Sequence, residues 1–149
     1  MAVRTKWLGR GYESESIDEA AGHTLIGDEP AAIGGADAGP SPFALLQMSL
    51  GSCAVGTLMR AARDEKIPIE ELEVEVAFKL NRLDETAESH FTITCDLRMT
   101  EIRERIRVAG DIDEEQLGVL LWTAENCPIT NTVAGGVPIK HSIELTGDG

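Results

Sequence analysis

The chain has 149 residues, a length typical of one domain with its own core, so we expect residues 1–149 to fold as a single domain. It carries 26 acidic against 13 basic residues, which gives a formal net charge of −13. Nucleic acids and anionic membranes both need a basic surface, so this charge argues against either partner.

Further kinds of site, and the location of the protein, can be predicted from the cysteines, the histidines and the N-terminal residues. The 3 cysteines form no CxxC pair and are too few for a disulfide framework. The 3 histidines are scattered along the chain, so the sequence does not support a metal site, and we expect no bound cofactor. Residues 1–16 lack an apolar core of signal-peptide length, which predicts a cytoplasmic protein.

Short strands and a loop are predicted ahead of residue 41. Alternating side chains predict a strand over residues 2–8, a glycine-containing turn follows it, and further strands are expected over residues 12–17 and 23–27. Residues 29–40 combine glycines, alanines and prolines, which is typical of a loop. The Gly34-Gly35 pair in this loop lacks the spacing and the Lys-Ser/Thr of a phosphate-binding loop.

A long apolar helix is predicted within segment 39–66, which reads GPSPFALLQMSLGSCAVGTLMRAARDEK. Ser41 is a good N-cap and Pro42 suits the first helical position, whereas Pro68 forbids further helix. No residue from 43 to 59 is charged. A helix that is apolar on all sides must be buried on all sides, so we expect this helix at the centre of the protein.

Cys53 lies in the middle of this helix. Steps of three and four residues place it on one stripe with Phe43, Leu46 and Leu50. A thiol in such a helix is either an inert core residue or a reactive group, and the helix alone does not decide between the two.

The next segment is predicted to form strands. Strict alternation indicates a half-buried strand over residues 72–80, a polar turn over 81–89 and a strand over 91–99 with Cys95 as a structural residue on its apolar face. Residues 102–108 continue that strand or extend it across a bulge, with arginines on one solvated face.

The last part of the chain predicts a helix and a final strand. The helix covers residues 113–125, begins with a capping box of Asp111 and Glu114, and leaves Trp122 off its apolar stripe. Residues 137–145 predict a strand with His141 as a core or edge residue. Helices separated by antiparallel strands indicate an α+β fold, and a homodimer would cover the all-apolar helix that one chain's sheet leaves exposed.

Cys127 precedes Pro128, a pattern typical of an N-cap followed by the first residue of a helix. A thiolate at this position faces unpaired N–H groups and the positive end of the helix dipole. Such placement lowers the pKa of a thiol. A structural role for both cysteines stays open here, but an N-cap is an unusual position for an inert thiol.

The sequence GPSPFALLQMSLGSC, followed by GDIDEEQLGVLLWTAENC and then AENCPITNTV, resembles the OsmC/Ohr family of thiol-dependent peroxidases from about Trp7 to Leu145. The resemblance implies an OsmC-like α+β fold, an intertwined homodimer whose antiparallel sheets wrap around central cysteine-bearing helices. It also implies that Cys53 is a peroxidatic cysteine, Cys127 is a resolving cysteine, and an external dithiol or lipoyl-type reductant restores both.

The resemblance further implies how the thiol is surrounded and activated. Apolar neighbours, namely Phe43, Leu46, Leu50 and Trp122, suit an organic hydroperoxide. Burial raises the pKa of a thiol, so a cation must offset it, and the family uses an arginine from the N-terminal hairpin. Arg10 is the nearest match in this chain, with Arg4 as its rival.

One position departs from the peroxidases of this family, which carry a glutamate directly after the proline that opens the first helix. Phe43 occupies that position here, and no acidic residue occurs between Asp37 and Asp64. The leading hypothesis is a thiol peroxidase for organic hydroperoxides in oxidative stress defence. The alternative is a non-peroxidase OsmC-like module that binds a small apolar or acyl ligand in the dimer pocket.

Overall fold

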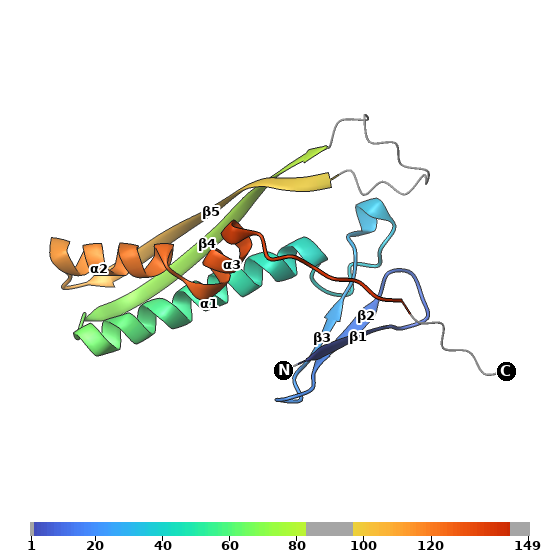
Figure 1. The fold of residues 1–149 in the computed structure, drawn as a ribbon, viewed down its shortest axis with the longest axis horizontal. Coiled ribbons are helices and arrows are strands. Elements are labelled where there is room, and N and C mark those ends of the chain that lie inside the picture. Colours follow the sequence, from blue (N-terminus) through green and yellow to red (C-terminus); the bar gives the residue numbers. More distant parts are fainter. Residues whose placement is uncertain (1, 83–96, 144–149) are drawn as a thin grey trace.

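The computed structural model describes residues 2–82 and 97–143 as an α+β fold of antiparallel sheets and helices (Figure 1). The elements in chain order are β1 (Val3–Trp7), β2 (Ser14–Asp18), β3 (Thr24–Gly27), the 3-10 turn η1 (Ala31–Ile33), α1 (Pro42–Glu65), β4 (Ile69–Arg82), β5 (Leu97–Gly110), α2 (Glu114–Glu125) and α3 (Pro128–Gly135). The α+β class predicted from the sequence is therefore confirmed.

The first sheet contains β1, β2 and β3 in that order, all antiparallel. The three predicted strands are present, but β2 begins at Ser14 because the preceding residues close a turn. In that turn the N–H of Leu8 donates to the carbonyl of Glu13 at 3.0 Å, and the N–H of Glu13 donates to the carbonyl of Arg10 at 3.2 Å. This turn carries Arg10 beyond the end of the strands.

Helix α1 begins and ends where the sequence predicts. The hydroxyl of Ser41 accepts a hydrogen bond from the N–H of Ala44 at 3.3 Å, and Pro42 is the first helical residue. The helix ends at Lys66, whose φ of 57° is left-handed and lets its N–H bond back to the carbonyl of Ala62. These local signals fix the axial position of Cys53 within the helix.

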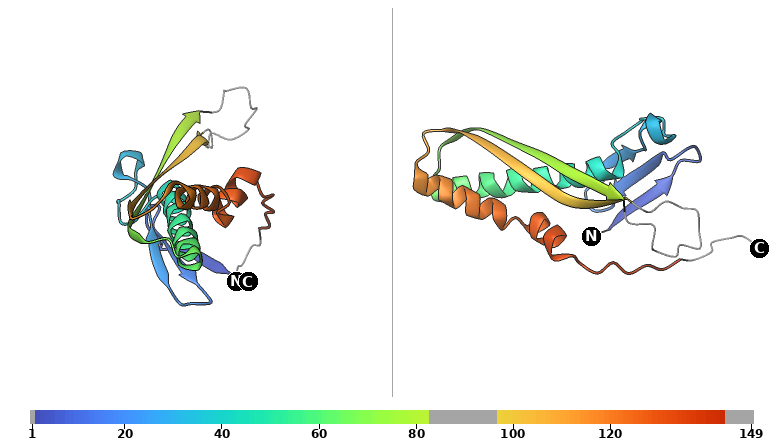
Figure 2. Two further views of the ribbon diagram at one scale, coloured as in Figure 1. Left: turned by 90° about the vertical axis from the view of Figure 1, so that its left-hand side faces the viewer. Right: turned by 90° about the horizontal axis from the view of Figure 1, so that it is seen from above.

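Strands β4 and β5 form a long antiparallel hairpin that lies along α1 (Figures 1 and 2). The strands predicted over 72–80 and 102–108 both lie in it, and Arg107 pairs with Glu73 and Glu75 on its solvated face. The turn predicted over 81–89 lies outside the described residues beyond position 82. The strand predicted over 91–99 is described only from Leu97, so Cys95 lies outside the described residues as well.

The core lies between the C-terminal half of α1, α2 and the β4–β5 hairpin. Its buried members are Leu58, Ala62, Ile67, Leu120 and Ala124. Helix α2 occupies the predicted range, but its capping box is different: Asp113 and Gln116 bond each other's backbone N–H groups at 2.8 and 3.1 Å. The predicted box of Asp111 and Glu114 is wrong because the chain enters the helix two residues later.

The final predicted strand is also wrong over the part of it that the structure describes. Residues 137–143 have no regular structure and run away from α3 as a single trace (Figure 1). A strand needs a neighbour for its ladder of hydrogen bonds, and none of the described strands pairs with this segment. Val137 and Ile139 are therefore 61% and 78% exposed in one chain, and His141 is exposed rather than part of a core.

One chain buries only one stripe of α1, formed by Leu50, Ala54, Leu58 and Ala62. The expectation that this helix is buried on all sides is thus not met within a single chain, since Met48 is 57% exposed and Met59 is 44% exposed. By length and composition alone, α1 would also be long and apolar enough to cross a membrane, but core helices of soluble proteins pass the same test.

Candidate active site

The predicted site centres on two thiols that come from different helices. Cys53 lies near the middle of α1, where the side-chain amide of Gln47 donates to the carbonyl of Val76 at 2.6 Å and ties the helix to β4. Cys53 is half-buried. The long helix therefore positions this sulfur by its attachment to the hairpin.

Cys127 is placed by the junction of α2 and α3. Its N–H donates to the carbonyl of Ala124 at 3.1 Å, and its carbonyl accepts from the N–H of Asn131 at 2.9 Å as α3 begins. Cys127 is the N-cap of α3 and Pro128 follows it, as the sequence predicts. The side chain of Cys127 is fully buried in the chain.

The two sulfurs are in direct contact, with Cys53 Sγ and Cys127 Sγ 2.9 Å apart. Both thiols are free, and the separation is longer than a disulfide bond of about 2.05 Å. The hydroxyl of Thr57 lies 3.9 Å from each sulfur. Because Thr57 follows Cys53 by one helical turn, α1 presents both groups to Cys127 together.

Opposing effects act on the pKa of Cys127. Burial is the largest of them and raises the pKa of the thiol. The neighbouring Cys53 thiol, the backbone of Thr130, the hydroxyl of Thr57 and the backbone of Ile129 act in the other direction, in that order of influence. Together they outweigh burial, so the pKa of Cys127 lies below its ordinary value.

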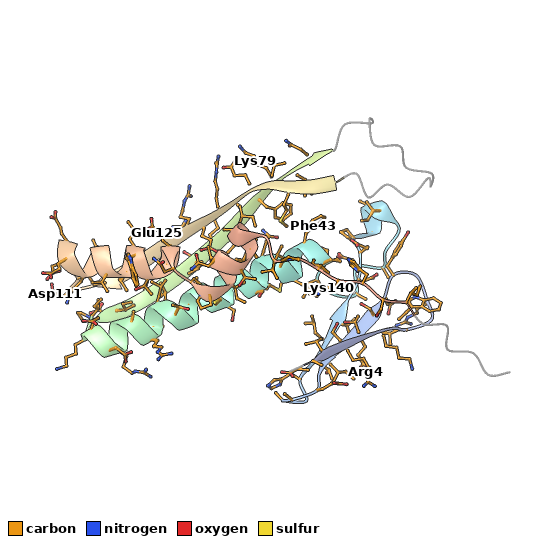
Figure 3. All side chains as sticks on the ribbon, in the orientation of Figure 1. Arg4, Phe43, Lys79, Asp111, Glu125 and Lys140 are labelled. Carbon is orange, nitrogen blue, oxygen red and sulfur yellow. The ribbon has the colours of Figure 1, made fainter. Side chains whose placement is uncertain are left out.

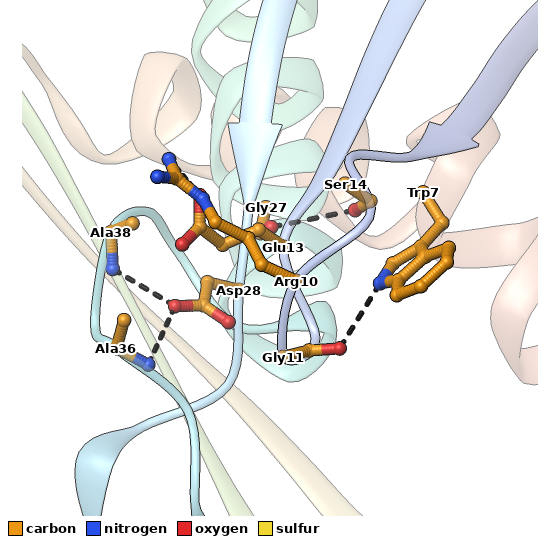
Figure 4. Close-up of polar contacts among 9 residues, drawn as sticks. All are labelled: Trp7, Arg10, Gly11, Glu13, Ser14, Gly27, Asp28, Ala36 and Ala38. Carbon is orange, nitrogen blue, oxygen red and sulfur yellow. Dashed lines mark hydrogen bonds and ion pairs between the residues drawn. The ribbon is translucent and has the colours of Figure 1, made fainter.

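Arg10 bonds to a carboxylate that the sequence analysis did not anticipate. Its Nε and Nη2 atoms lie 2.9 and 2.7 Å from Oε2 of Glu13, within the turn between β1 and β2 (Figure 4). The side chain of Glu13 is only 8% exposed, while that of Arg10 is 74% exposed. A buried carboxylate thus holds an arginine whose surface faces outward.

Arg4, the rival of Arg10, pairs with Glu19 at 2.6 Å and lies on the N-terminal sheet (Figures 1 and 3). In the described part of one chain, the hydrogen bonds and ion pairs of both arginines go to carboxylates rather than to a sulfur. The Arg10-x-x-Glu13 spacing across a predicted turn was the signal in the sequence that could have identified Glu13.

Asp28 organises the loop beside this turn (Figure 4). Its Oδ2 atom accepts hydrogen bonds from the N–H groups of Ala36 at 2.8 Å and Ala38 at 3.1 Å. The bond from Ala38 is the strongest influence on Asp28 and, with the other backbone bonds, holds the pKa of this buried carboxyl below its usual value despite desolvation. Sequence analysis assigned residues 29–40 to a loop but missed its anchor.

A cavity of about 570 Å³ opens between α1, α2, α3 and β5. Leu46 and Leu50 line it, as the predicted substrate pocket requires, together with Ile106, Leu121, Ala124 and Val133 among others. Phe43 and Trp122 do not line it: the ring of Phe43 packs 5.6 Å from that of Phe78, and Trp122 is 65% exposed. Figure 3 labels Phe43 at the start of α1.

Carboxylate side chains are also among the residues that line this largely apolar cavity. Glu104 lines it from β5 and accepts a hydrogen bond from the hydroxyl of Thr130 at 3.3 Å, and Glu125 lines it from the end of α2. In residues 2–82 and 97–143, no three His, Cys, Asp or Glu side chains gather closely enough to hold a metal ion. Neither Cys53 nor Cys127 lines the cavity, although Leu50 and Ala124, each three residues before one of the cysteines, do line it.

Comparison with known proteins identifies the family to which the chain belongs. A family model described as OsmC-like protein matches residues 34–142. The match covers more than half of the chain, and the protein therefore belongs to the OsmC-like family.

Solved structures share the fold at low identity. A protein from Psychrobacter arcticus, described as an osmotic stress induced and detoxification response protein, has a TM-score of 0.72 at 22% identity, with 89% of this chain and 87% of that chain covered. OsmC from Legionella pneumophila, an organic hydroperoxide resistance protein, has a TM-score of 0.67 at 17% identity, with 93% and 92% covered.

A third neighbour contains a small molecule. It is a protein from Vibrio cholerae that is described as an organic hydroperoxide resistance protein and has captopril bound in one of its active sites. Its TM-score is 0.64 at 17% identity, with 91% of this chain and 86% of that chain covered. A search of curated proteins gave no significant match. At these identities the structures establish the fold alone.

Proposed function

We propose that this protein is a thiol-dependent peroxidase that reduces organic hydroperoxides through Cys53 and Cys127 in defence against oxidative stress. The observation that carries the proposal is the 2.9 Å contact between two free sulfurs. Two-electron oxidation by a hydroperoxide, with loss of both thiol protons and a small approach of the sulfurs, would join them in a disulfide. The neighbours named for organic hydroperoxide resistance support the substrate class.

The difference in burial supports the two roles proposed for the cysteines. Cys53 is half-buried and Cys127 is fully buried, so a peroxide reaches Cys53 first. The Cys53 thiolate attacks one peroxide oxygen, the O–O bond breaks, and an alkoxide leaves a sulfenic acid behind. Cys127 then attacks the sulfenic sulfur, and a disulfide and water form.

The cycle closes with an external reductant. A dithiol, such as a lipoyl-type group, exchanges with the Cys53–Cys127 disulfide, takes up its oxidation and returns both thiols. Cytoplasmic residence fits this chemistry because thiols are kept reduced there.

The working unit in this proposal is a homodimer. One chain leaves apolar side chains exposed on the helices and in the segment after α3, including Met48, Leu121 and Trp122 at 57%, 60% and 65%. A second copy would cover such surface. It would also bring the exposed guanidinium of Arg10, held by Glu13, to a thiol site that it does not contact within one chain.

Mass spectrometry tests the peroxidase directly. The reduced protein receives one equivalent of tert-butyl hydroperoxide and is digested without reductant. We expect a peptide link between Cys53 and Cys127 in the wild type and none in Cys53→Ser. Thiols that remain unmodified in the wild type would refute the proposal.

The cavity favours a second candidate, a binding module for a small apolar or acyl ligand. It has a volume of about 570 Å³ and is lined mainly by aliphatic side chains from the helices and β5. Such a volume lies in the range of small-molecule sites. Phe43, which stands where the family's peroxidases carry a glutamate, packs its ring on that of Phe78 and leaves the first turn of α1 without an acidic residue, although it does not line the cavity.

Thermal unfolding separates the two candidates. A ligand selective for the folded protein must raise its melting temperature. Medium-chain fatty acids at 100 times their dissociation constant would stabilise a binding module by about 2.7 kcal/mol. If millimolar fatty acid does not raise the melting temperature and hydroperoxide does form the disulfide, the binding module is refuted. The peroxidase is then the candidate that remains.

A further inference from the structure

Thr57 is a third polar side chain at the thiol pair, and the sequence analysis assigned it no role. It is half-buried and lies one helical turn after Cys53 on α1. Its hydroxyl oxygen lies 3.9 Å from Cys53 Sγ and 3.9 Å from Cys127 Sγ, while the two sulfurs are 2.9 Å apart. The hydroxyl therefore connects α1 to the start of α3 at the point where the sulfurs meet.

The direction of the Thr57 side chain differs from that of two other threonines in helices. A threonine inside a helix can bond to the carbonyl four residues before it. Thr123 on α2 and Thr132 on α3 do so, with oxygen–oxygen distances of 2.7 and 2.8 Å to those carbonyls. In the described part of the chain, the hydrogen bonds of the Thr57 hydroxyl go to the two sulfurs instead. This hydroxyl is thus directed to the thiol pair and not to the backbone of its own helix.

The sulfur of Cys127 depends on α1 for its side-chain hydrogen bonds. Cys127 is the N-cap of α3, but its side chain makes no capping hydrogen bond to that helix. Among the described residues, its sulfur bonds with Thr57, whose hydroxyl donates, and with Cys53. The contact with Cys53 must change when that sulfur is oxidised, because an oxygen atom is added to it. Thr57 is not altered by the oxidation, so its contact with Cys127 is the one that can persist.

We propose that Thr57 is a positioning residue for the second step of the peroxidase cycle. Its hydroxyl holds the Cys127 sulfur beside Cys53 while Cys53 is a sulfenic acid. The proposal rests on the peroxidase function proposed above and deepens it, because it names a residue that acts through the resolving thiol. Correct placement of two reacting groups accounts for a large part of the rate of a step within one molecule.

Thr57 takes no part in the exchange of atoms. The Cys127 sulfur attacks the sulfenic sulfur of Cys53, the S–O bond breaks and the S–S bond forms. The thiol proton of Cys127 leaves with the hydroxyl as water, so the sulfenic sulfur is reduced and the Cys127 sulfur is oxidised. In the reduced protein the sulfurs are 2.9 Å apart, and a disulfide bond is about 2.05 Å long. A small displacement of the Cys127 side chain is therefore enough to slow this step.

A single-turnover experiment with rapid acid quench and intact-protein mass spectrometry tests the proposal. The reduced protein receives one equivalent of tert-butyl hydroperoxide, and all proteins carry Cys95→Ser so that the third cysteine does not react. The mass distinguishes the sulfenic acid, which is one oxygen atom heavier, from the disulfide, which is two hydrogen atoms lighter. Thr57→Val removes the hydroxyl and keeps the shape of the side chain. We expect the sulfenic acid to persist about tenfold longer in this variant, with a smaller effect on its formation.

Four further variants serve as controls. Thr57→Ser keeps the hydroxyl and should restore the wild-type lifetime, whereas Thr57→Ala lacks it and should behave like Thr57→Val. Thr123→Val is the matched control, because it makes the same change at a threonine whose hydroxyl bonds to the carbonyl of Val119, and it should retain the wild-type lifetime. Cys127→Ser gives the lifetime of a sulfenic acid without its resolving thiol. Circular dichroism checks that each variant is folded.

Oxidation by diamide tests the same placement without a peroxide. Diamide adds to one thiol, and the second thiol then displaces the resulting hydrazine to form the disulfide. This displacement needs the same approach of the two sulfurs as the resolving step. We expect it to be about tenfold slower in Thr57→Val and Thr57→Ala than in the wild type and Thr57→Ser.

The outcomes separate this proposal from the peroxidase function. A longer-lived sulfenic acid in both variants that lack the hydroxyl, with wild-type behaviour in Thr57→Ser, supports the positioning role. An unchanged lifetime in Thr57→Val and Thr57→Ala, or an equal slowing of both steps, overturns it. If hydroperoxide oxidises neither thiol, the peroxidase is refuted instead, and the diamide experiment still decides whether Thr57 positions Cys127.

Discussion

Arg10 and Glu13 form an ion pair inside the turn that joins β1 to β2, with two nitrogen atoms of the guanidinium within 2.9 Å of one carboxylate oxygen. The family's peroxidases supply this carboxylate from the start of the first long helix, where this chain has Phe43. Here the hairpin holds its own arginine. The loss of the helix carboxylate therefore does not leave Arg10 without a partner.

The first prediction concerns this pair. In Glu13→Gln, Arg10 loses its charged anchor, and we expect consumption of tert-butyl hydroperoxide to fall by about tenfold, because a nearby cation shifts a thiol pKa by roughly one unit or more. Arg10→Gln should cause a loss at least as large. Arg4→Gln, which breaks only the exposed pair with Glu19, is the control and should retain the wild-type rate. Wild-type rates in Glu13→Gln and Arg10→Gln, as in the control Arg4→Gln, would contradict the role of Arg10.

Local signals in the sequence account for most of what could be predicted. Ser41-Pro42 and Cys127-Pro128 mark helix starts through the chemistry of the first turn, and the structure begins α1 and α3 there. Alternation predicted the half-buried strands of the hairpin because the period of two is a property of the backbone. The roles expected of Cys53 and Cys127 rest on the family resemblance, whereas the 2.9 Å separation of their sulfurs comes from the structure.

The features that the sequence does not predict depend on contacts between residues that are far apart in the chain or on the path of a loop. The predicted final strand has the right alternation, but pairing depends on a neighbouring strand that the described part of one chain does not supply. Asp28 reaches N–H groups 8 and 10 residues away through a loop whose path no periodicity defines. The contact between Arg10 and Glu13 depends on the path of the turn between β1 and β2, which the alternation of the strands does not define.

The second prediction concerns Asp28 and acid. Its folded pKa is depressed, so its contribution to stability is present above the unfolded value, about 3.9, and is lost as pH falls through the folded value. We expect Asp28→Asn to lower the urea midpoint at pH 7 and to differ less from the wild type as pH falls below about 4. Asp18→Asn is the control, because Asp18 also accepts backbone N–H groups but is only half-buried. A gap between Asp28→Asn and the wild type that persists unchanged to pH 2 would contradict the prediction.

The third prediction concerns the core. Leu58 is fully buried among Ala62, Leu120 and their neighbours. We expect Leu58→Ala to lower the free energy of unfolding by about 2–5 kcal/mol through lost burial and a cavity. Leu25→Ala removes the same atoms from a side chain that is 40% exposed, and its loss should be clearly smaller. Urea unfolding measures both variants, and a loss below about 1 kcal/mol for Leu58→Ala would place the core elsewhere.

The last prediction concerns the assembly. Leu121 and Trp122 follow each other on α2 and are 60% and 65% exposed in one chain, although both are large and apolar. If a second copy covers them, a carboxylate at either position is desolvated at the interface, which costs several kcal/mol. We therefore expect Leu121→Glu and Trp122→Glu to convert a dimer into monomers at micromolar concentration, as measured by light scattering after gel filtration. Arg63→Glu, at a position that is already charged and 74% exposed, is the control and should remain dimeric. A wild type that elutes as a monomer would refute the dimer, and dimeric Glu variants would move the interface away from α2.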